Sequence, residues 1–327
     1  MQADARGRIL LARFDVTIAG ELNLDLILYG LPEELAPERE LLASDMMLTL
    51  GSSSAVVAHN LSSLGCRVGF SSCVGQDSFG DTAIDRLRAA GVDVSTVQRL
   101  GNGAKTGLSV ILPREKWRNI LTYSGTISAL KPEHLDMSYL TSSRHFHLSS
   151  YFLQSGLQAH IPALLRELKS AGLTISLDTN DDPDDLWQSD LDKVIPLVDV
   201  LMPNEREAMK MAGLNDLESA LRYLSAQVPL VVVKLGAQGS VACRGSERIY
   251  SASRKLDVIV DSVGAGDSFD AGFLSEFVRG SDLKICLRKG NLTGALSTTR
   301  PGGTEAFRNA DYRDQFLAEH AAQLPVD

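Results

Sequence analysis

A glycine-rich turn followed by an aspartate is the segment of this sequence best suited to chemistry. It runs Asp261-Ser-Val-Gly-Ala-Gly-Asp267, and phenylalanines follow at every fourth position of 269–277, which predicts a helix. The turn therefore precedes a helix N-terminus, where the first N–H groups lack partners and the helix dipole favours negative charge. Residues with almost no side chain let these amides approach a phosphoryl group closely. They are Gly264, Ala265 and Gly266.

Asp267 lies beside this predicted anion site. A carboxylate next to a phosphate is repulsive unless it has a task, and the natural task is to accept the proton of a hydroxyl that attacks the phosphorus. The alternative is structural: Asp267 caps the helix, and the glycines only turn the chain.

The same segment resembles the C-terminal signature of the ribokinase-like (PfkB) carbohydrate kinase family, and further blocks of the chain resemble that family in the same order. The resemblance implies a single α/β domain, 1–327, with three layers: a mostly parallel sheet flanked by helices, plus a small β-sheet lid. It also implies transfer of the γ-phosphoryl group of ATP to a hydroxyl. The further blocks are Gly20–Asp25, Val74–Gly80, Leu87–Val92, Met202–Glu207, Lys234–Gly239 and Gly294–Gly303.

Several roles follow from this resemblance. Asp267 matches the catalytic base, and the three residues before it match an anion hole. Asn204 and Glu207 match a motif that organises Mg²⁺, largely through water, which suits an ion that keeps several waters. A turn asparagine followed by a helix-start glutamate is the alternative for that pair. Asp261 is the side chain expected at a monovalent cation such as K⁺.

Asn23 and Asp25 match the family's contacts to sugar hydroxyls. Residues two apart on a strand point to the same face, so this amide and this carboxylate can grip neighbouring hydroxyls. A strand-end turn is the structural alternative.

The next substrate motif departs from the family pattern. It begins at Gly51, but Ser52 replaces the usual second glycine and Val56 replaces an asparagine that commonly binds a substrate hydroxyl. Ser52 and Ser53 can supply hydroxyls instead, or they belong to a helix N-cap cluster. The identity of the acceptor is therefore open.

The predicted nucleotide side combines the matched block 234–239 with residues outside the matched blocks. Gly236 and Gly239 match the turn near the adenosine, and Asn291 matches a nucleotide-side position whose alternative is a helix-surface residue. Asp178 and Asn180, at the end of a predicted strand, are candidates near the phosphates.

Two further departures concern charge. Lys234 stands where the family usually has a small hydroxyl residue, and it either meets phosphate as a point charge or lies in solvent. Asp270 replaces an asparagine one helical turn after Asp267. The two carboxylates either share a face, which raises the pKa of one of them, or Asp270 is bonded elsewhere.

Alternating strands and helices must position these residues. Such alternation predicts a parallel sheet, with ligands outside the carboxyl ends of its strands. Two β-rich stretches, Ile18–Tyr29 and Thr106–Tyr123, predict antiparallel strands in a small sheet beside the main domain; the alternative is an edge extension of the main sheet. The expected lid covers about 20–48 and 100–124. Predicted strands are Val68–Val74, Leu173–Asp178, Val198–Met202 and Leu230–Leu235, and predicted helices are Ala55–Leu64, Asp81–Ala90, Leu157–Ala171, Glu205–Ala212 and Asp216–Ala226.

Composition narrows the class of protein. The chain has 327 residues and a net charge of −9, which disfavours partners such as nucleic acid or an anionic membrane. No apolar run approaches the roughly 18 residues that span a bilayer. Four cysteines without a C-x-x-C pair indicate buried thiols in a reducing compartment, and the N-terminus (1–13) lacks a signal-peptide pattern, so we expect a cytoplasmic protein. His145 and His147 have no third ligand nearby, which favours a structural role over metal binding.

The sequence thus predicts an ATP- and Mg²⁺-dependent sugar kinase acting on a ketose, aldose or keto-deoxy acid. A nucleoside kinase and a catalytically silent binding module are the alternatives, whereas a dinucleotide-dependent oxidoreductase lacks its G-x-G-x-x-G fingerprint. A homodimer through the lid is plausible. A phosphosugar acceptor needs extra cations, for which the predicted lid offers Lys105, Arg114, Lys116 and Arg118.

Overall fold

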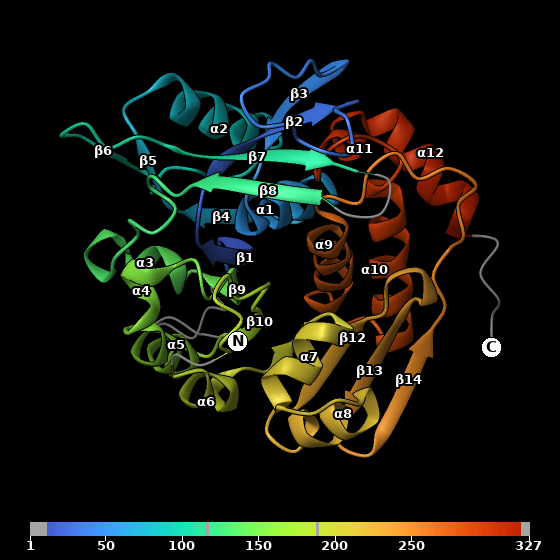
Figure 1. Cartoon of the computed structure of the whole chain (residues 1–327). Helices are drawn as coiled ribbons and strands as arrows, with labels where there is room; N and C mark the ends of the chain where they lie inside the picture. The colour runs from blue at the N-terminus through green and yellow to red at the C-terminus, as the bar shows by residue number, and fades with distance from the viewer. Residues whose placement is uncertain (1–11, 115–117, 188–189, 322–327) are drawn as a thin grey trace.

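A large, mostly parallel sheet forms the centre of the molecule (Figure 1). The computed structural model describes residues 12–114, 118–187 and 190–321. Six of the sheet's eight strands are parallel, and two antiparallel strands extend it at one edge. In sheet order the strands are β14 (Glu247–Ser251), β13 (Ser240–Arg244), β12 (Leu230–Lys234), β11 (Val200–Leu201), β10 (Thr174–Asp178), β9 (Ser143–Ser149), β1 (Phe14–Ala19) and β4 (Val68–Ser71).

Helices cover both faces of this sheet, which confirms the predicted three-layer α/β fold. Each face has its own apolar core, because successive residues of a strand, such as Phe146 and His147, point to opposite sides of the sheet. One face packs against α3 (Met137–Leu140), α4 (Ser155–Gln158), α5 (Ile161–Ser170), α6 (Leu191–Val194), α7 (Glu205–Ala212) and α8 (Leu217–Ser225). The other packs against α1 (Ser53–Ser63), α2 (Ser78–Ala89), α9 (Ala265–Phe277) and α10 (Leu283–Ser297), beside which lie α11 (Glu305–Arg308) and α12 (Ala310–Ala321).

A second, separate sheet lies above the first in Figure 1, as predicted. The predicted antiparallel pairing is confirmed for β2 with β3 and for β7 with β8, but it was wrong for β2 and β7, which are parallel neighbours. Ile18 and Ala19 belong to the main sheet instead. Its strands, in sheet order, are β3 (Asp45–Leu50), β2 (Asn23–Tyr29), β7 (Gly107–Pro113) and β8 (Arg118–Tyr123), while β5 (Cys73–Gly75) and β6 (Gln98–Leu100) form a separate pair.

Two predicted elements were wrong in their extent. The helix expected over 157–171 is interrupted, because α5 starts afresh with Pro162 in its first turn, where a missing N–H costs no hydrogen bond. The strand expected over 68–74 is divided into β4 and β5, which belong to different sheets.

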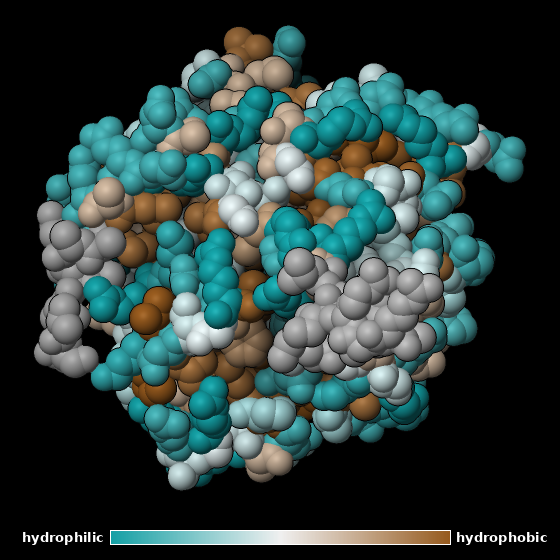
Figure 2. Space-filling view, turned by 180° about the vertical axis from the view of Figure 1, so that it is seen from behind, coloured by the Kyte–Doolittle hydropathy of each residue, from teal (hydrophilic) through white to brown (hydrophobic). Residues whose placement is uncertain are grey.

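The surface seen in Figure 2 is largely hydrophilic, with apolar residues showing through in patches. The four cysteines are buried and free, as the sequence indicated. In the part of the chain that the structure describes, no helix is long and apolar enough to cross a membrane.

Candidate active site

Two adjoining cavities lie at the carboxyl ends of the parallel strands. The polar cavity, of about 600 Å³, is lined by residues of both sheets, including Asn23, Asp25 and Asp267. The apolar cavity, of about 450 Å³, is lined by Leu256, Ile259 and Phe269 among others. The residues common to both linings are Lys234, Gly236, Ser262, Ala265 and Gly266. The α9 N-terminus therefore lies where the two cavities meet.

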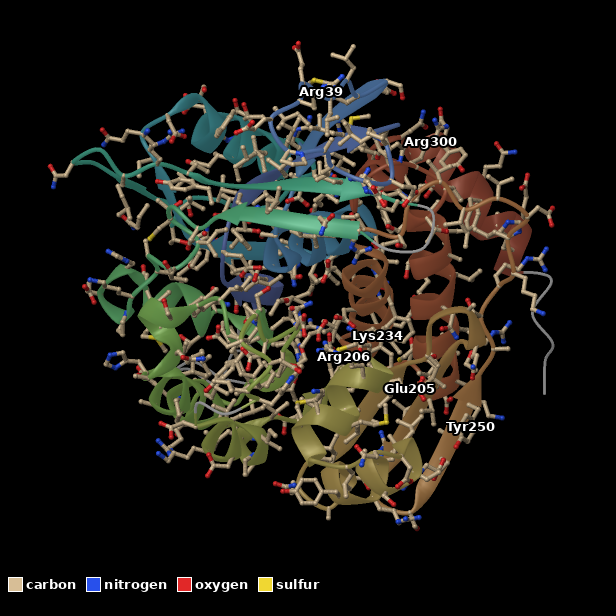
Figure 3. All side chains as sticks on the ribbon, in the orientation of Figure 1. Arg39, Glu205, Arg206, Lys234, Tyr250 and Arg300 are labelled. Atoms are coloured by element: carbon tan, nitrogen blue, oxygen red, sulfur yellow. The ribbon has the colours of Figure 1, made fainter. Side chains whose placement is uncertain are left out.

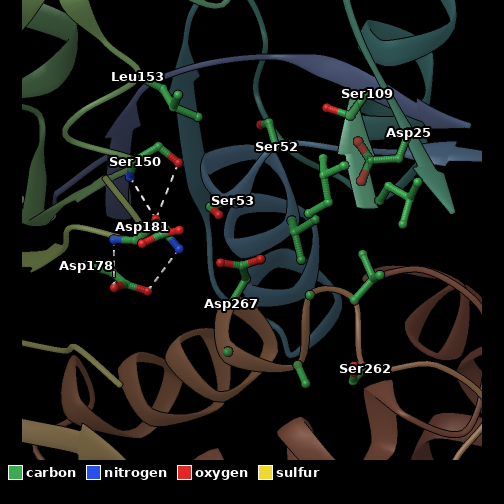
Figure 4. A pocket seen from close by; sticks show the side chains of 18 of the residues that line it. Asp25, Ser52, Ser53, Ser109, Ser150, Leu153, Asp178, Asp181, Ser262 and Asp267 are labelled. Atoms are coloured by element: carbon green, nitrogen blue, oxygen red, sulfur yellow. Dashed lines mark hydrogen bonds between the residues drawn. The ribbon is translucent and has the colours of Figure 1, made fainter. Parts of the chain in front are cut away.

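The glycine-rich turn lies at this junction, and its backbone requires glycine at position 264. Gly264 is the N-cap of α9 with φ +70°, a left-handed conformation, and a Cβ there would lie 2.5 Å from the Cα of Gly303. Asp267 sits in the first turn of α9 and points into the polar cavity, toward Ser53 (Figure 4). The sequence thus predicted both the helix start and the neighbourhood of its aspartate.

The surroundings of Asp267 tune its acidity in opposite directions. Burial raises the pKa of Asp267, and the nearby Asp178 carboxylate raises it further. The Lys234 ammonium and hydrogen bonding by Ser53 and Asn180 lower the pKa, so the net rise is what remains after their compensation. A carboxyl of raised pKa is a stronger proton acceptor once ionised, which suits a general base.

Lys234 lies inside a buried ion cluster beneath Asp267, near the centre of Figure 3. Its Nζ is 2.6 Å from Oδ2 of Asp178 and 3.1 Å from Oδ2 of Asp270, and the Lys234 side chain is only 11% exposed. The solvent-exposed alternative for Lys234 was therefore wrong, and Asp270 is indeed bonded elsewhere. The two charge departures from the family pattern contact each other.

This cluster contains two carboxyl groups and one ammonium group. Burial opposes ionisation of Asp178, but the charge of Lys234 and hydrogen bonds with Lys234, Asp270 and the Asn180 N–H together lower the pKa of that carboxyl. Burial raises the pKa of Asp270 well above its usual range, with Asp178 adding to the rise. Asp178 is thus the ionised partner of Lys234, and Asp270 is the carboxyl that more readily holds a proton.

Asn204 and Glu207 form a reciprocal cap at the start of α7. The Asn204 Oδ1 accepts from the Glu207 N–H at 2.9 Å, and the Glu207 Oε2 accepts from the Asn204 N–H at 2.9 Å. Both residues also line the polar cavity. Burial and the nearby Asp178 raise the pKa of Glu207 to about 7. The structural alternative is therefore present in the geometry, and the same oxygens remain suited to Mg²⁺ with its waters.

Asn23 and Asp25 lie on β2 and face the polar cavity together, as their spacing predicted. Gly51 makes room for them, since a Cβ there would lie 2.2 Å from Oδ1 of Asp25 and 2.7 Å from Nδ2 of Asn23. Burial, together with the charge of Asp267, raises the pKa of Asp25 to about 7.

Ser52 lines the polar cavity and also forms hydrogen bonds with backbone groups. Its hydroxyl donates to the Glu21 carbonyl at 2.7 Å and accepts from the Ala55 N–H at 3.1 Å, so it caps α1. It has φ +66°, the left-handed region in which the expected glycine is comfortable and serine is strained. Ser53 lines the cavity, and Val56 lines it while packing against Gly303.

The predicted nucleotide-side residues meet at the apolar cavity. Gly236 and Gly239 line it, and Gly239 has φ +107° where a Cβ would meet the Ser251 carbonyl at 2.0 Å. Asn291 lines it too, and its Nδ2 donates to the Ser251 carbonyl at 2.9 Å. Asn291 is buried, so its helix-surface alternative was wrong.

Asp261 is occupied by hydrogen-bond donors. Its Oδ1 accepts from the Val263 N–H at 2.9 Å and its Oδ2 from the Gly302 N–H at 3.0 Å, while the Tyr29 hydroxyl donates at 3.4 Å. Asp261 thus links the loop before α9 to the Gly302 turn and to the small sheet. The monovalent cation at this residue stays a prediction.

Sequence reasoning missed several residues of the polar cavity. Glu21 is buried, and both its carboxylate oxygens accept from Ser54 at the start of α1. Ser150 was also missed; it and the predicted candidate Asn180 both have left-handed backbones, and the Asn180 Oδ1 accepts from the Ser150 N–H at 2.8 Å (Figure 4). Such strain gathers at functional sites, but its signal is tertiary. Glu21 lies inside the matched block 20–25, which was its one available sequence signal.

Of the four lid cations considered, Arg118 is the one that lines the polar cavity; Lys105 and Arg114 do not, and Lys116 lies outside the described residues. Arg118 comes from β8, and its Nη1 donates to the Ser262 hydroxyl at 3.1 Å. It therefore bridges the small sheet and the loop before α9.

His145 and His147 lie apart from the cavities, buried on one face of β9. Their four ring nitrogens are hydrogen-bonded to hydroxyls, each at 2.7 Å, and burial lowers their pKa values to about 3 and about 4. Both rings are neutral at ordinary pH. Their partners are Thr174, Ser176 and Ser149.

Comparison with known proteins gives this geometry a family context. Residues 13–310 match the model of the pfkB family carbohydrate kinases. The chain is 30% identical over 309 residues to the ATP-dependent ribose-1-phosphate kinase of Halopiger xanaduensis, covering 93% of this chain and 98% of that protein. It is 28% identical over 281 residues to the 2-dehydro-3-deoxygluconokinase of Bacillus subtilis, covering 82% and 86%.

A solved structure agrees with the fold over almost the whole chain. An E. coli protein in complex with ATP and Mg²⁺ superposes with a TM-score of 0.81 at 25% identity, covering 94% of this chain and 100% of that one.

Proposed function

The chain belongs to the pfkB family of carbohydrate kinases, and we propose that it transfers the γ-phosphoryl group of ATP to a sugar hydroxyl, with Asp267 as the base. One observation carries this proposal: Asp267 points into the polar cavity beside the first amides of α9, where that cavity meets the apolar one. A hydroxyl held in the polar cavity is thereby close to a proton acceptor and to donors for developing negative charge.

The residues present fit ATP and Mg²⁺. The apolar cavity offers Phe269 and Ile259 to a flat base, and its glycine turn leaves room for backbone contact. Carboxylate and amide oxygens of Glu207, Asn204 and Asp178 line the neighbouring polar cavity, and these are the ligands that Mg²⁺ takes, directly or through water. When bound, Mg²⁺ supplies positive charge to the phosphates.

The chain's own residues carry the remaining steps. Asn23 and Asp25 orient the acceptor by accepting and donating hydrogen bonds. Asp267 takes the proton of the attacking hydroxyl onto its carboxylate. The amides of Gly264, Ala265 and Gly266 donate to the transferring group, and Lys234 holds Asp178 and Asp270 in place below.

The small sheet is proposed to act as a lid over the acceptor. Two contacts already join it to the loop before α9: Tyr29 to Asp261, and Arg118 to Ser262. Ile120 and Thr122 of β8 also line the polar cavity, yet every residue of β8 is exposed, so the inner face of this sheet has room to close.

We infer that the acceptor carries an acidic group. Arg118 pairs with no carboxylate among the residues that the structure describes, and it lines the acceptor side. The names of the two relatives refer to a dehydro-deoxygluconate and to ribose 1-phosphate, both of which carry an acidic group. No aromatic side chain is found among the described residues that line this cavity, which disfavours a nucleoside.

The test is ADP release from ATP, Mg²⁺ and K⁺ across neutral sugars, keto-deoxy acids, sugar phosphates and nucleosides. We expect the best acceptor to be acidic, and Asp267→Ala to lower kcat by about 10²–10⁴-fold with the fold retained. More than about a tenth of wild-type turnover in that variant contradicts the base assignment. Silence across the panel with ATP still bound favours the non-catalytic binding module.

Arg118→Ala tests the acceptor class separately, with Arg118→Lys as its matched control. We expect the KM of an acidic acceptor to rise at least about tenfold in Arg118→Ala, and less in Arg118→Lys, while the KM of ATP is unchanged. An equal effect on neutral and acidic acceptors contradicts a specific role for the charge.

A further inference from the structure

A third cavity, of about 590 Å³, lies between α1, α2, α11 and α12, outside the two cavities described above. Arg86, Arg308 and Arg313 line it from three different helices, together with one carboxylate, Asp85. Arg86 and Arg308 share one carboxylate, Glu305, whereas Arg313 pairs with Asp314 and Asp85 pairs with Arg88. One guanidinium charge therefore remains in excess at this lining, in a chain whose net charge is −9. We propose that this cavity binds a small hydroxylated anion, such as a phosphorylated sugar acid, and that the anion regulates acceptor binding.

The ring of His59 provides the cavity with one hydrogen-bond acceptor, and the neighbouring contacts determine which ring nitrogen it is. Its side chain is 3% exposed, and its Nδ1 lies 2.8 Å from Oδ1 of Asn60. The Asn60 Nδ2 donates to the Gly303 carbonyl at 3.0 Å, and a carbonyl only accepts, so the amide orientation is set. Nδ1 of His59 therefore donates, which leaves Nε2 as an acceptor.

Nε2 of His59 has no hydrogen-bond partner among the described residues, and His59 lines the cavity. Burial lowers the pKa of His59 to about 4, which is consistent with a neutral ring. A hydroxyl of a ligand can donate to this nitrogen. Because this nitrogen accepts a hydrogen bond, we expect the anion to carry hydroxyl groups. The arginines by themselves would not require hydroxyl groups on the ligand.

The arginines keep donors for the anion itself. Arg308 donates from Nη1 to Glu305, and Arg313 donates from Nε to Asp314. A guanidinium has five N–H donors, so neither hydrogen bond exhausts its arginine. Two arginines from neighbouring helices can therefore bind one phosphate or carboxylate with paired, charge-assisted hydrogen bonds.

One route from this cavity leads to the α9 N-terminus. Asn60, which holds His59, also donates to the Ser268 hydroxyl at 3.0 Å, and Ser268 directly follows Asp267. Its other acceptor, Gly303, packs against Gly264 of the proposed anion hole. The wall of the cavity is thus two hydrogen bonds from the transfer site.

A second route leads to the small sheet. Arg86 donates from Nη1 to Oε1 of Glu305 at 2.8 Å and from Nη2 to the Leu48 carbonyl at 2.9 Å, and Thr49 donates to the same glutamate at 2.8 Å. Leu48 and Thr49 belong to β3, which ends beside Gly51. An anion competes with Glu305 for Arg86 and Arg308, and so loosens the attachment of β3. We therefore expect the ligand to weaken acceptor binding.

Binding is tested by calorimetric titration with 3-phosphoglycerate, sulfate and, as an uncharged control, glycerol. A non-hydrolysable ATP analogue with Mg²⁺ is present throughout to occupy the nucleotide side. We expect 3-phosphoglycerate to bind with a Kd of about 1 mM or tighter, and more tightly than sulfate. The Arg308→Gln/Arg313→Gln double variant weakens binding at least tenfold, whereas Arg244→Gln, an exposed arginine on β13, leaves it unchanged.

Two results of this titration overturn the site. One is the absence of heat for both anions up to about 10 mM. The other is equal affinity in the wild type and the double variant, which assigns the anion to another place. The titration needs no active acceptor, so it separates failure of this inference from failure of the proposed function.

Regulation is tested by acceptor kinetics with saturating 3-phosphoglycerate. We expect the KM of the acceptor to rise about fivefold in the wild type, with kcat nearly constant, and to stay unchanged in the double variant. Circular dichroism confirms that the double variant is folded. If the anion binds but the wild-type kinetics do not change, the regulatory role is wrong.

Discussion

The two ends of the polar cavity are built differently, although they lie within one cleft. The end proposed for phosphoryl transfer, called the transfer end, contains the contiguous segment 262–267 beside a buried ion cluster of the main domain. The acceptor end draws on β2, β8 and the start of α1, with Asp25, Arg118 and Ser52 coming from distant parts of the chain.

Their departures from the family pattern also differ in kind. At the transfer end, Lys234 and Asp270 contact each other, so one change compensates the other. At the acceptor end, Ser52 keeps a left-handed backbone suited to glycine, and Val56 faces the cavity where an amide was expected. We expect the first kind to preserve phosphoryl transfer and the second kind to change which acceptor binds.

Breaking the compensated pair has the largest expected effect. Lys234→Met leaves Asp178 and Asp270 buried, and no other described cation pairs with either of them. We expect the free energy of unfolding to fall by about 3–5 kcal/mol at pH 7, measured by urea denaturation. Lys193→Met, which removes an exposed pair with Asp190, is the control and costs less than about 1 kcal/mol.

A double-mutant cycle sharpens this test. Adding Asp270→Asn to Lys234→Met removes one of the two uncompensated carboxylates, so at least half of the lost stability returns. If Asp270→Asn has the same effect with and without Lys234, the two departures are independent and the comparison fails at the transfer end.

The pH dependence of acceptor binding tests the other end. Below pH 7 the Asp25 carboxylate gains a proton, because burial and the charge of Asp267 raise its pKa to about 7. Its hydrogen bonds from acceptor hydroxyls are then lost, so the acceptor Kd rises as the pH falls through 7, up to about tenfold per unit. The measurement is calorimetric titration with the ATP analogue present.

Two variants identify the group responsible. Asp25→Asn is expected to bind weakly and without this pH dependence. Asp267→Asn keeps the dependence but moves it to lower pH, because one of the charges that raise the pKa of Asp25 is gone. An unshifted profile in Asp25→Asn assigns the titration to another group.

A glycine at each end gives a steric comparison. Gly51→Ala brings a Cβ within 2.2 Å of Oδ1 of Asp25, so the acceptor KM rises at least about tenfold. Gly266→Ala meets Lys234 Nζ at 3.7 Å, an ordinary contact, and leaves the acceptor KM unchanged. Equal acceptor KM values in the two variants contradict the steric account of Gly51.

Ser52 gives the smallest effect. Ser52→Ala loses two hydrogen bonds and keeps φ at +66°, so the free energy of unfolding falls by about 1–2 kcal/mol. Ser52→Gly loses the same bonds but relieves the backbone, and thus stays within about 1 kcal/mol of the wild type. Thermal unfolding of both variants measures the difference, and identical midpoints show that the serine backbone is not strained.

Much of both ends was predictable because the sequence signals there are local. Glycines before an amphipathic helix specify a helix N-terminus, and Asp267 follows within one turn. Residues 23 and 25 share a face because a strand has a period of two. The order of strands and helices likewise predicted the parallel sheet, which has its cavities at the expected edge.

The sequence by itself therefore determined the layers of the fold and the segments that approach the cleft, since both depend on periodicity and short-range backbone geometry. Tertiary structure alone decided the contacts between segments far apart in the chain. It paired Lys234 with Asp178 and Asp270, buried Asn291, placed Arg118 over Ser262, and gathered three arginines around His59. The physical reason is that charge pairing and burial depend on neighbours in space, which spacing along a chain does not specify.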